Sequence, residues 1–140
     1  MASKKSLIFD SDRIKIDVET NFLSNHSDTK NSEYFFSYTI TIRNLSDRIV
    51  QLISRHWLIT DSTGEIQEVR GEGVVGKKPI IFPGNQFQYT SGVGIKSAAG
   101  TMEGSYSMTT QLEKEDKGLR VSTFEVPIPA FSIHIPHVLH

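Results

Sequence analysis

The sequence contains no cysteine, which excludes a disulfide framework, a thiol nucleophile and any zinc site built from cysteine. It has no apolar run approaching the roughly 18–20 residues that cross a bilayer. Net charge is nearly absent too, since 15 Lys and Arg stand against 16 Asp and Glu, whereas a dedicated nucleic-acid binder is usually strongly basic. These absences predict a cytoplasmic protein that neither inserts into membranes nor binds nucleic acid.

Good helix formers are also scarce. The 140 residues include only 8 Leu and 4 Ala, against 15 Ile, 9 Val and 11 Thr. Branching at Cβ restricts a side chain in a helix but suits a pleated, half-buried strand. The composition therefore indicates an all-β protein. Residues 1–12 are predicted to be a flexible N-terminus, and residues 13–140 to form a single domain.

Alternating apolar and polar residues locate the strands. In residues 13–20, Ile14, Ile16 and Val18 alternate with charged residues, and residues 34–43 alternate in the same way. Further strands are predicted at 49–60, 66–70, 86–96, 101–112 and 119–126, with turns at 61–64, 97–100 and 113–118 joining successive hairpin pairs. Seven or eight such strands predict a β-sandwich of two antiparallel sheets, with a closed barrel as the alternative.

Residues 49–60 are apolar on both faces of the predicted strand. One face carries Ile53, Trp57 and Ile59, and the other carries Val50, Leu52 and Leu58. This pattern predicts a strand that is covered on both sides, or an edge used for association, so both a monomer and a homodimer remain open. We expect Trp57 to point into the core with Arg55 on the same face, and His56 to point the other way.

Several motifs follow one another in a fixed order along the second half of the chain. They are Arg-His-Trp-Leu-Ile-Thr-Asp at 55–61, Gln-Glu-Val-Arg-Gly-Glu-Gly-Val-Val-Gly at 67–76, Pro-Gly at 83–84, Phe-Gln-Tyr-Thr-Ser-Gly at 87–92, Gly-Thr-Met-Glu-Gly-Ser-Tyr-Ser-Met at 100–108, and Pro-Ala-Phe-Ser-Ile-His-Ile-Pro-His-Val-Leu-His at 129–140. In this order they resemble the ApaG family, and the resemblance extends from about residue 14 to residue 140.

The resemblance implies a fibronectin type III-like or immunoglobulin-like β-sandwich. The family takes its name from a gene beside a diadenosine tetraphosphate hydrolase, and its bacterial members are associated with cobalt and magnesium efflux or resistance. Related eukaryotic domains, in F-box proteins and a DNA polymerase δ-interacting protein, look like protein-binding modules. We therefore expect a non-enzymatic module that binds an unknown protein and affects cation handling indirectly, because a fold alone does not establish a reaction.

A glycine-rich segment at 71–76 formally satisfies the G-x-G-x-x-G pattern of phosphate-binding loops. Gly71, Gly73 and Gly76 carry the pattern, and Lys77 and Lys78 follow it directly. The prolines and isoleucines of residues 79–83 predict extended chain where a dinucleotide-binding loop would continue into a helix. A looser alternative is a sensor that binds pyrophosphate-containing nucleotides in this loop, and the other is a purely structural connection.

The expected partner-binding residues are Arg55, His56, Arg70 and Glu72, beside the same loop. No nucleophile-elbow motif accompanies any serine, so no catalytic residue is predicted. The remaining candidates, His134, His137 and His140, are three residues apart, and Pro136 opposes the helix that would align them. We therefore predict neither a metal site nor a cofactor.

Overall fold

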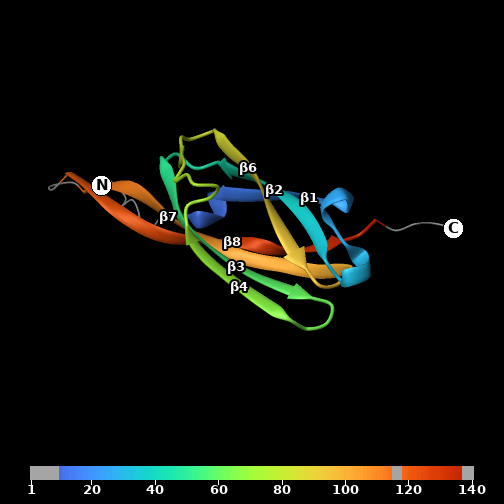
Figure 1. The fold of residues 1–140 in the computed structure, drawn as a ribbon. Coiled ribbons are helices and arrows are strands. Elements are labelled where there is room, and N and C mark those ends of the chain that lie inside the picture. The colour runs from blue at the N-terminus through green and yellow to red at the C-terminus, as the bar shows by residue number, and fades with distance from the viewer. Residues whose placement is uncertain (1–9, 115–117, 137–140) are drawn as a thin grey trace.

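Strand pairing confirms the predicted β-sandwich. The computed structural model describes residues 10–114 and 118–136, and Figure 1 shows their strands in two layers. One sheet has the order β1-β2-β6, from β1 (Ile14–Phe22), β2 (Tyr34–Asn44) and β6 (Gln86–Ile95). The other has the order β4-β3-β7-β8, from β3 (Val50–Asp61), β4 (Ile66–Glu72), β7 (Ala99–Lys114) and β8 (Gly118–His134), and the short β5 (Ile80–Ile81) pairs with β3.

The strand order is that of a fibronectin type III-like sandwich, a close variant of the immunoglobulin arrangement. In a constant-type immunoglobulin domain the fourth strand lies in the sheet of the first two strands. Here β4 pairs with β3 in the opposite sheet, through an antiparallel register that runs from Ser54↔Glu72 to Thr60↔Ile66. The connection between them contains Gly64 at φ +90°, which confirms the turn predicted at residues 61–64.

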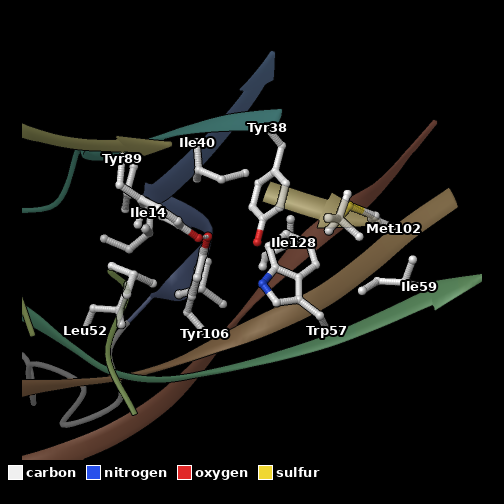
Figure 2. Close-up of a cluster of buried hydrophobic side chains, with 14 of the residues drawn as sticks. Ile14, Tyr38, Ile40, Leu52, Trp57, Ile59, Tyr89, Met102, Tyr106 and Ile128 are labelled. Atoms are coloured by element: carbon white, nitrogen blue, oxygen red, sulfur yellow. Dashed lines mark hydrogen bonds between the residues drawn. The ribbon is translucent and has the colours of Figure 1, made fainter. Parts of the chain in front are cut away.

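The core lies between the two sheets and is built around the single tryptophan. Trp57 is 1% exposed and makes edge-to-face contacts with Tyr38 of β2, Tyr106 of β7 and Phe131 of β8. Figure 2 shows Tyr89 and Tyr106 reaching toward each other from opposite sheets, and their hydroxyl oxygens are 2.5 Å apart. Trp57 therefore points inward, as expected from the sequence.

A β-bulge in β3 corrects the interpretation of its two apolar faces. The register with β7 shifts between Leu52 and Ser54. Even-numbered residues face the core before this point, and odd-numbered residues face it afterwards. Val50 and Leu52 before the bulge and Trp57 and Ile59 after it are all buried in the same core. Because β4 and β7 flank β3 on its two sides, the strand also offers no free edge for association.

Two other expectations about strand pairing were wrong. β6 and β7 do not form a hairpin, because they belong to different sheets and residues 96–98 carry the chain across the sandwich. The last strand does not end before Pro127, since β8 continues through Pro127 and Pro129 to His134. Proline is tolerated there because β8 is the edge strand of its sheet.

Three 3-10 helices complete the described elements: η1 (Ser11–Arg13), η2 (Ser24–His26) and η3 (Thr29–Asn31). Arg13 donates from Nε and Nη2 to the carbonyl of Leu45, at 3.2 and 2.9 Å, and this fixes the start of β1. Most of the predicted flexible N-terminus, residues 1–9, lies outside the described residues. Within the described part of the chain, no helix has the length and apolar character needed to cross a bilayer.

Candidate interaction surface

The outward face of the five-stranded sheet brings together polar residues that are far apart in the sequence. Beyond the bulge, His56 points away from the core and lies between Arg70 of β4 and Ser105 of β7. In the neighbouring row, Ser54 lies between Glu72 and Ser107, and Ser107 lies beside Glu125 of β8. These residues line a shallow hollow of about 370 Å³, which we call the outer hollow.

Glu68 lies beside the outer hollow and interacts with two of the residues that line it. His56 Nε2 lies 2.7 Å from Glu68 Oε2, and Arg70 Nη2 donates to the same oxygen at 3.3 Å. The hydrogen bond from His56, together with the positive charge of Arg70, lowers the pKa of the Glu68 carboxyl from its ordinary value. The side chain of His56 is 27% exposed, so the sheet holds the imidazole at its surface rather than in the core.

Arg55 shares the side of Trp57 in the alternation of β3, as expected, but it also lines the outer hollow beside Gly71, and it anchors the following loop. Its Nη1 donates to the carbonyl oxygens of Glu72 at 3.1 Å and Gly73 at 2.8 Å. A Cβ on Gly71 would approach the guanidinium atoms to 2.8 Å, so glycine leaves the space in which Arg55 lies. Arg55 therefore has a structural role, and contact with a partner stays a prediction.

The 71–76 segment is a tight turn at the end of β4. Val74 and Lys77 exchange backbone hydrogen bonds of 2.8 and 2.9 Å around Val75 and Gly76, whose φ angles are +45° and +77°. Positive φ at both central positions is typical of a type I′ turn, and it is unusual for a β-branched residue such as Val75. No helix begins after the turn: residues 78–79 have no regular secondary structure and β5 follows at Ile80, in agreement with the sequence, which predicted no helix after Gly76.

This turn engages several amides that a phosphate-binding loop would leave free. Gly73 N donates to Ile53 O at 2.7 Å, and the amides of Val74 and Lys77 bond to each other's carbonyls. Lys78 Nζ lies 3.5 Å from Glu72 Oε2, which directs that cation toward a carboxylate of the same chain. The glycine pattern thus produces a hairpin-like turn, and the Arg55 side chain binds the two carbonyls that precede it.

The sequence missed four members of the outer hollow: Ser54, Ser105, Ser107 and Glu125. Their proximity depends on the register between β3, β7 and β8, which no local motif reveals. The alternation of serine with large residues in 105–108 was the available signal, because it marks a strand with small polar side chains on one face.

The C-terminal histidines are only partly described. His134 ends β8, whereas His137 and His140 lie outside the described residues. Among the residues that the structure describes, no three His, Asp or Glu side chains are grouped so that they could hold a metal ion.

The strand order and the polar outer hollow define a small fibronectin type III-like domain that presents polar side chains on the outward face of its five-stranded sheet. The comparisons identify its family: residues 24–110 match the family model of the ApaG domain, and the chain belongs to that family.

Similar proteins support the assignment over nearly the whole chain. A Protein ApaG from Nitrosomonas eutropha is 47% identical over 127 residues, which cover 91% of this chain and 94% of that protein. A Protein ApaG from Pectobacterium carotovorum is 44% identical, with 91% and 96% covered. The crystal structure of a Bordetella pertussis protein described as ApaA superposes with a TM-score of 0.79 at 38% identity, covering 89% of this chain and 95% of that one.

Proposed function

We propose that this protein is a non-enzymatic interaction module that binds another protein at the outer hollow. The observation that carries the proposal is that two neighbouring rows of polar residues lie on one face of the five-stranded sheet. One row is Arg70, His56 and Ser105, and the other is Glu72, Ser54 and Ser107. Small hydroxyls at the centre with longer charged side chains around them form a shallow polar surface. Such a surface suits the side chains of a partner protein better than it encloses a small substrate.

The hydrogen bonds in the outer hollow favour binding over chemistry. A nucleophile relay needs a base bonded to the nucleophile and a third group that orients the base. Here the imidazole Nε2 of His56 is bonded to Glu68, while the hydroxyl of Ser105 is directed at Glu125, 3.5 Å away. The two pairs are separate, so the histidine does not activate the serine.

The charge of the face indicates the chemistry of the partner. Glu68, Glu72, Glu103 and Glu125 are all exposed on or beside the outer hollow, against the guanidinium of Arg70. A partner segment carrying lysine or arginine would complement this surface and associate faster at low ionic strength. The association of ApaG relatives with cobalt and magnesium would then reflect the partner's activity, reached through this contact.

A charge reversal tests the surface. We expect Glu125→Lys to abolish capture of the partner from the native lysate, because it places a cation inside the acidic face. Glu19→Lys is the matched control: it makes the same change at an exposed position of β1, in the other sheet. Equal capture by both variants would contradict the proposed surface, and turnover of any metabolite by the pure protein would contradict a non-enzymatic role.

Nucleotide sensing by the 71–76 loop is the weaker alternative. The loop's internal hydrogen bonds and the Lys78–Glu72 pair leave fewer groups for a phosphate than the glycine pattern suggests. Titration calorimetry with diadenosine tetraphosphate, ATP and pyrophosphate tests it directly. Binding heat that disappears in a Lys77→Ala/Lys78→Ala variant would establish the sensor.

A further inference from the structure

The outer edge of β4 is an unpaired strand edge with a defined hydrogen-bonding pattern. Asp61 N donates to Glu65 O at 3.0 Å and Gly73 N donates to Ile53 O at 2.7 Å, which marks the hydrogen-bonded pairs at both ends of the β3–β4 ladder. Such pairs alternate along an antiparallel ladder. It follows that Ile66, Glu68 and Arg70 point their N–H and C=O groups away from β3, whereas the carbonyl of Glu72 accepts from Arg55 Nη1.

Two other sheet edges carry features that oppose pairing with another strand. β8 contains Pro127 and Pro129, and its register with β7 shifts between Met102 and Gly104. On β6, the carbonyl of Gly94 already accepts a hydrogen bond of 3.0 Å from the Gln67 side chain. β4 contains no proline and no register shift with β3, and its carbonyl with a side-chain donor is that of Glu72 at its end, which accepts from Arg55 Nη1 at 3.1 Å. Figure 1 shows β4 at the outer margin of its sheet.

The side chains along β4 are complementary to themselves in one antiparallel register. Glu68 and Arg70 are on the same outward face, with side chains 51% and 70% exposed. If two copies of β4 pair about a two-fold axis at Val69, each Glu68 stands opposite Arg70 of the second copy. Glu68 and Arg70 both direct their backbone N–H and C=O groups away from β3, so in this register each can form backbone hydrogen bonds with the residue opposite it in the second copy.

The neighbouring registers that keep the same alternation are disfavoured. An axis at residue 68 places two Glu68 carboxylates opposite each other, and an axis at residue 70 places two Arg70 guanidiniums opposite each other. Opposite charges across a strand pair attract and like charges repel. Among these three registers, the charges of β4 favour the one centred on Val69.

We propose that β4 is a self-association edge: it pairs antiparallel with β4 of a second copy, and the five-stranded sheets of both copies become continuous. The interface is isologous, because the same segment serves both copies. It places the two outer hollows on one face of the joined sheet, on either side of the axis. The proposal does not depend on the proposed function, since the association involves the strand edge and not the partner.

Sedimentation equilibrium on the full chain tests the pairing through charge reversal and rescue. We expect wild type to dimerise, and Arg70→Glu and Glu68→Arg each to weaken dimerisation by about tenfold or more, because each makes both cross-strand pairs repulsive. The double variant E68R/R70E restores opposite charges and should restore the dimer. Glu125→Lys, which disrupts the proposed partner surface, should dimerise as wild type does.

A backbone variant keeps the test independent of side-chain charge. Ile66→Pro removes one outward N–H at the first residue of an edge strand, where proline is tolerated by the monomer. We expect a folded monomer, with folding checked by circular dichroism. Wild type that stays monomeric at millimolar concentration, or dimers of undiminished affinity in Arg70→Glu and Ile66→Pro, would overturn the proposal.

Discussion

The polar contacts beside the outer hollow respond to pH through Glu68. Its carboxylate accepts from both His56 and Arg70, and these interactions lower its pKa from the ordinary value of 4.5. A lowered folded-state pKa means that the stabilisation is complete above the ordinary value and is lost as pH falls through the folded-state pKa. The contact therefore persists at neutral pH and disappears only in acid.

Replacing His56 with alanine tests this account. Because the hydrogen bond from His56 is the largest cause of the shift, His56→Ala should raise the pKa of Glu68 toward its ordinary value. The measurement is a carboxyl titration by NMR, with Arg70→Ala as a comparison that should produce a smaller rise in the same direction. An unchanged Glu68 titration in His56→Ala would show that the two groups are not coupled in solution.

At the scale of strands, the sequence predicted where β structure lies better than how the strands pair. Alternation located β1 and β2 because each has one buried face, as in Ile14–Ile16 and Phe36–Ile42. It failed in β3, because the bulge after Leu52 changes which residues face the core. Local turn chemistry likewise could not tell that β6 and β7 belong to different sheets, since a bend at residues 96–98 serves a hairpin or a crossover equally well.

The sequence analysis missed part of the outer hollow for the same physical reason. His56 and Arg70 were found because they are polar residues near a conspicuous loop, and their juxtaposition follows from the short β3–β4 hairpin. Ser105 and Glu125 reach the same surface only through the register of β7 and β8. Register over such distances depends on the packing of both sheets, which the local sequence does not encode.

The close approach of β7 to β3 gives an element-scale prediction. A Cβ on Gly104 would lie 2.0 Å from the His56 carbonyl oxygen, so Gly104→Ala must push the strands apart opposite Trp57. We expect a loss of about 1–3 kcal/mol in the free energy of unfolding, measured by urea denaturation. Gly92→Ala is the matched control: its Cβ meets only Phe36 O at 3.6 Å, and its stability should change by less than about 1 kcal/mol. Equal losses would contradict this packing account.

At the scale of the whole molecule, the two sheets are joined without a disulfide. Antibody domains pack the tryptophan of the third strand against a cystine that links the sheets. Here Trp57 packs against Tyr38 and Tyr106, and a hydrogen bond between Tyr106 and Tyr89 crosses the core. The hydrogen bond between these two buried hydroxyls therefore connects the two sheets in a chain that contains no cysteine.

This cross-sheet bond should appear as non-additive stability. Tyr89→Phe or Tyr106→Phe alone leaves the other hydroxyl buried without its partner, at a cost of about 1–3 kcal/mol. The double variant removes both hydroxyls and should lose less than the sum of the single variants, as a double-mutant cycle measures. Strict additivity would mean that the two hydroxyls do not interact.

The same pair makes stability sensitive to alkali. Burial raises the pKa of both hydroxyls above the ordinary value of 10.0, because the phenolate form would lose its hydration. The stabilisation that these two buried hydroxyls provide is complete below pH 10. It is lost above that pH, because the tyrosine hydroxyls of the unfolded chain release their protons before those of the folded chain do. Each hydroxyl should lower the free energy of unfolding by roughly 1.4 kcal/mol per pH unit there. Urea denaturation between pH 9 and pH 11 should therefore show that the free energy of unfolding falls more steeply for wild type than for Tyr89→Phe/Tyr106→Phe. Equal slopes would mean that other groups cause the loss of stability in alkali.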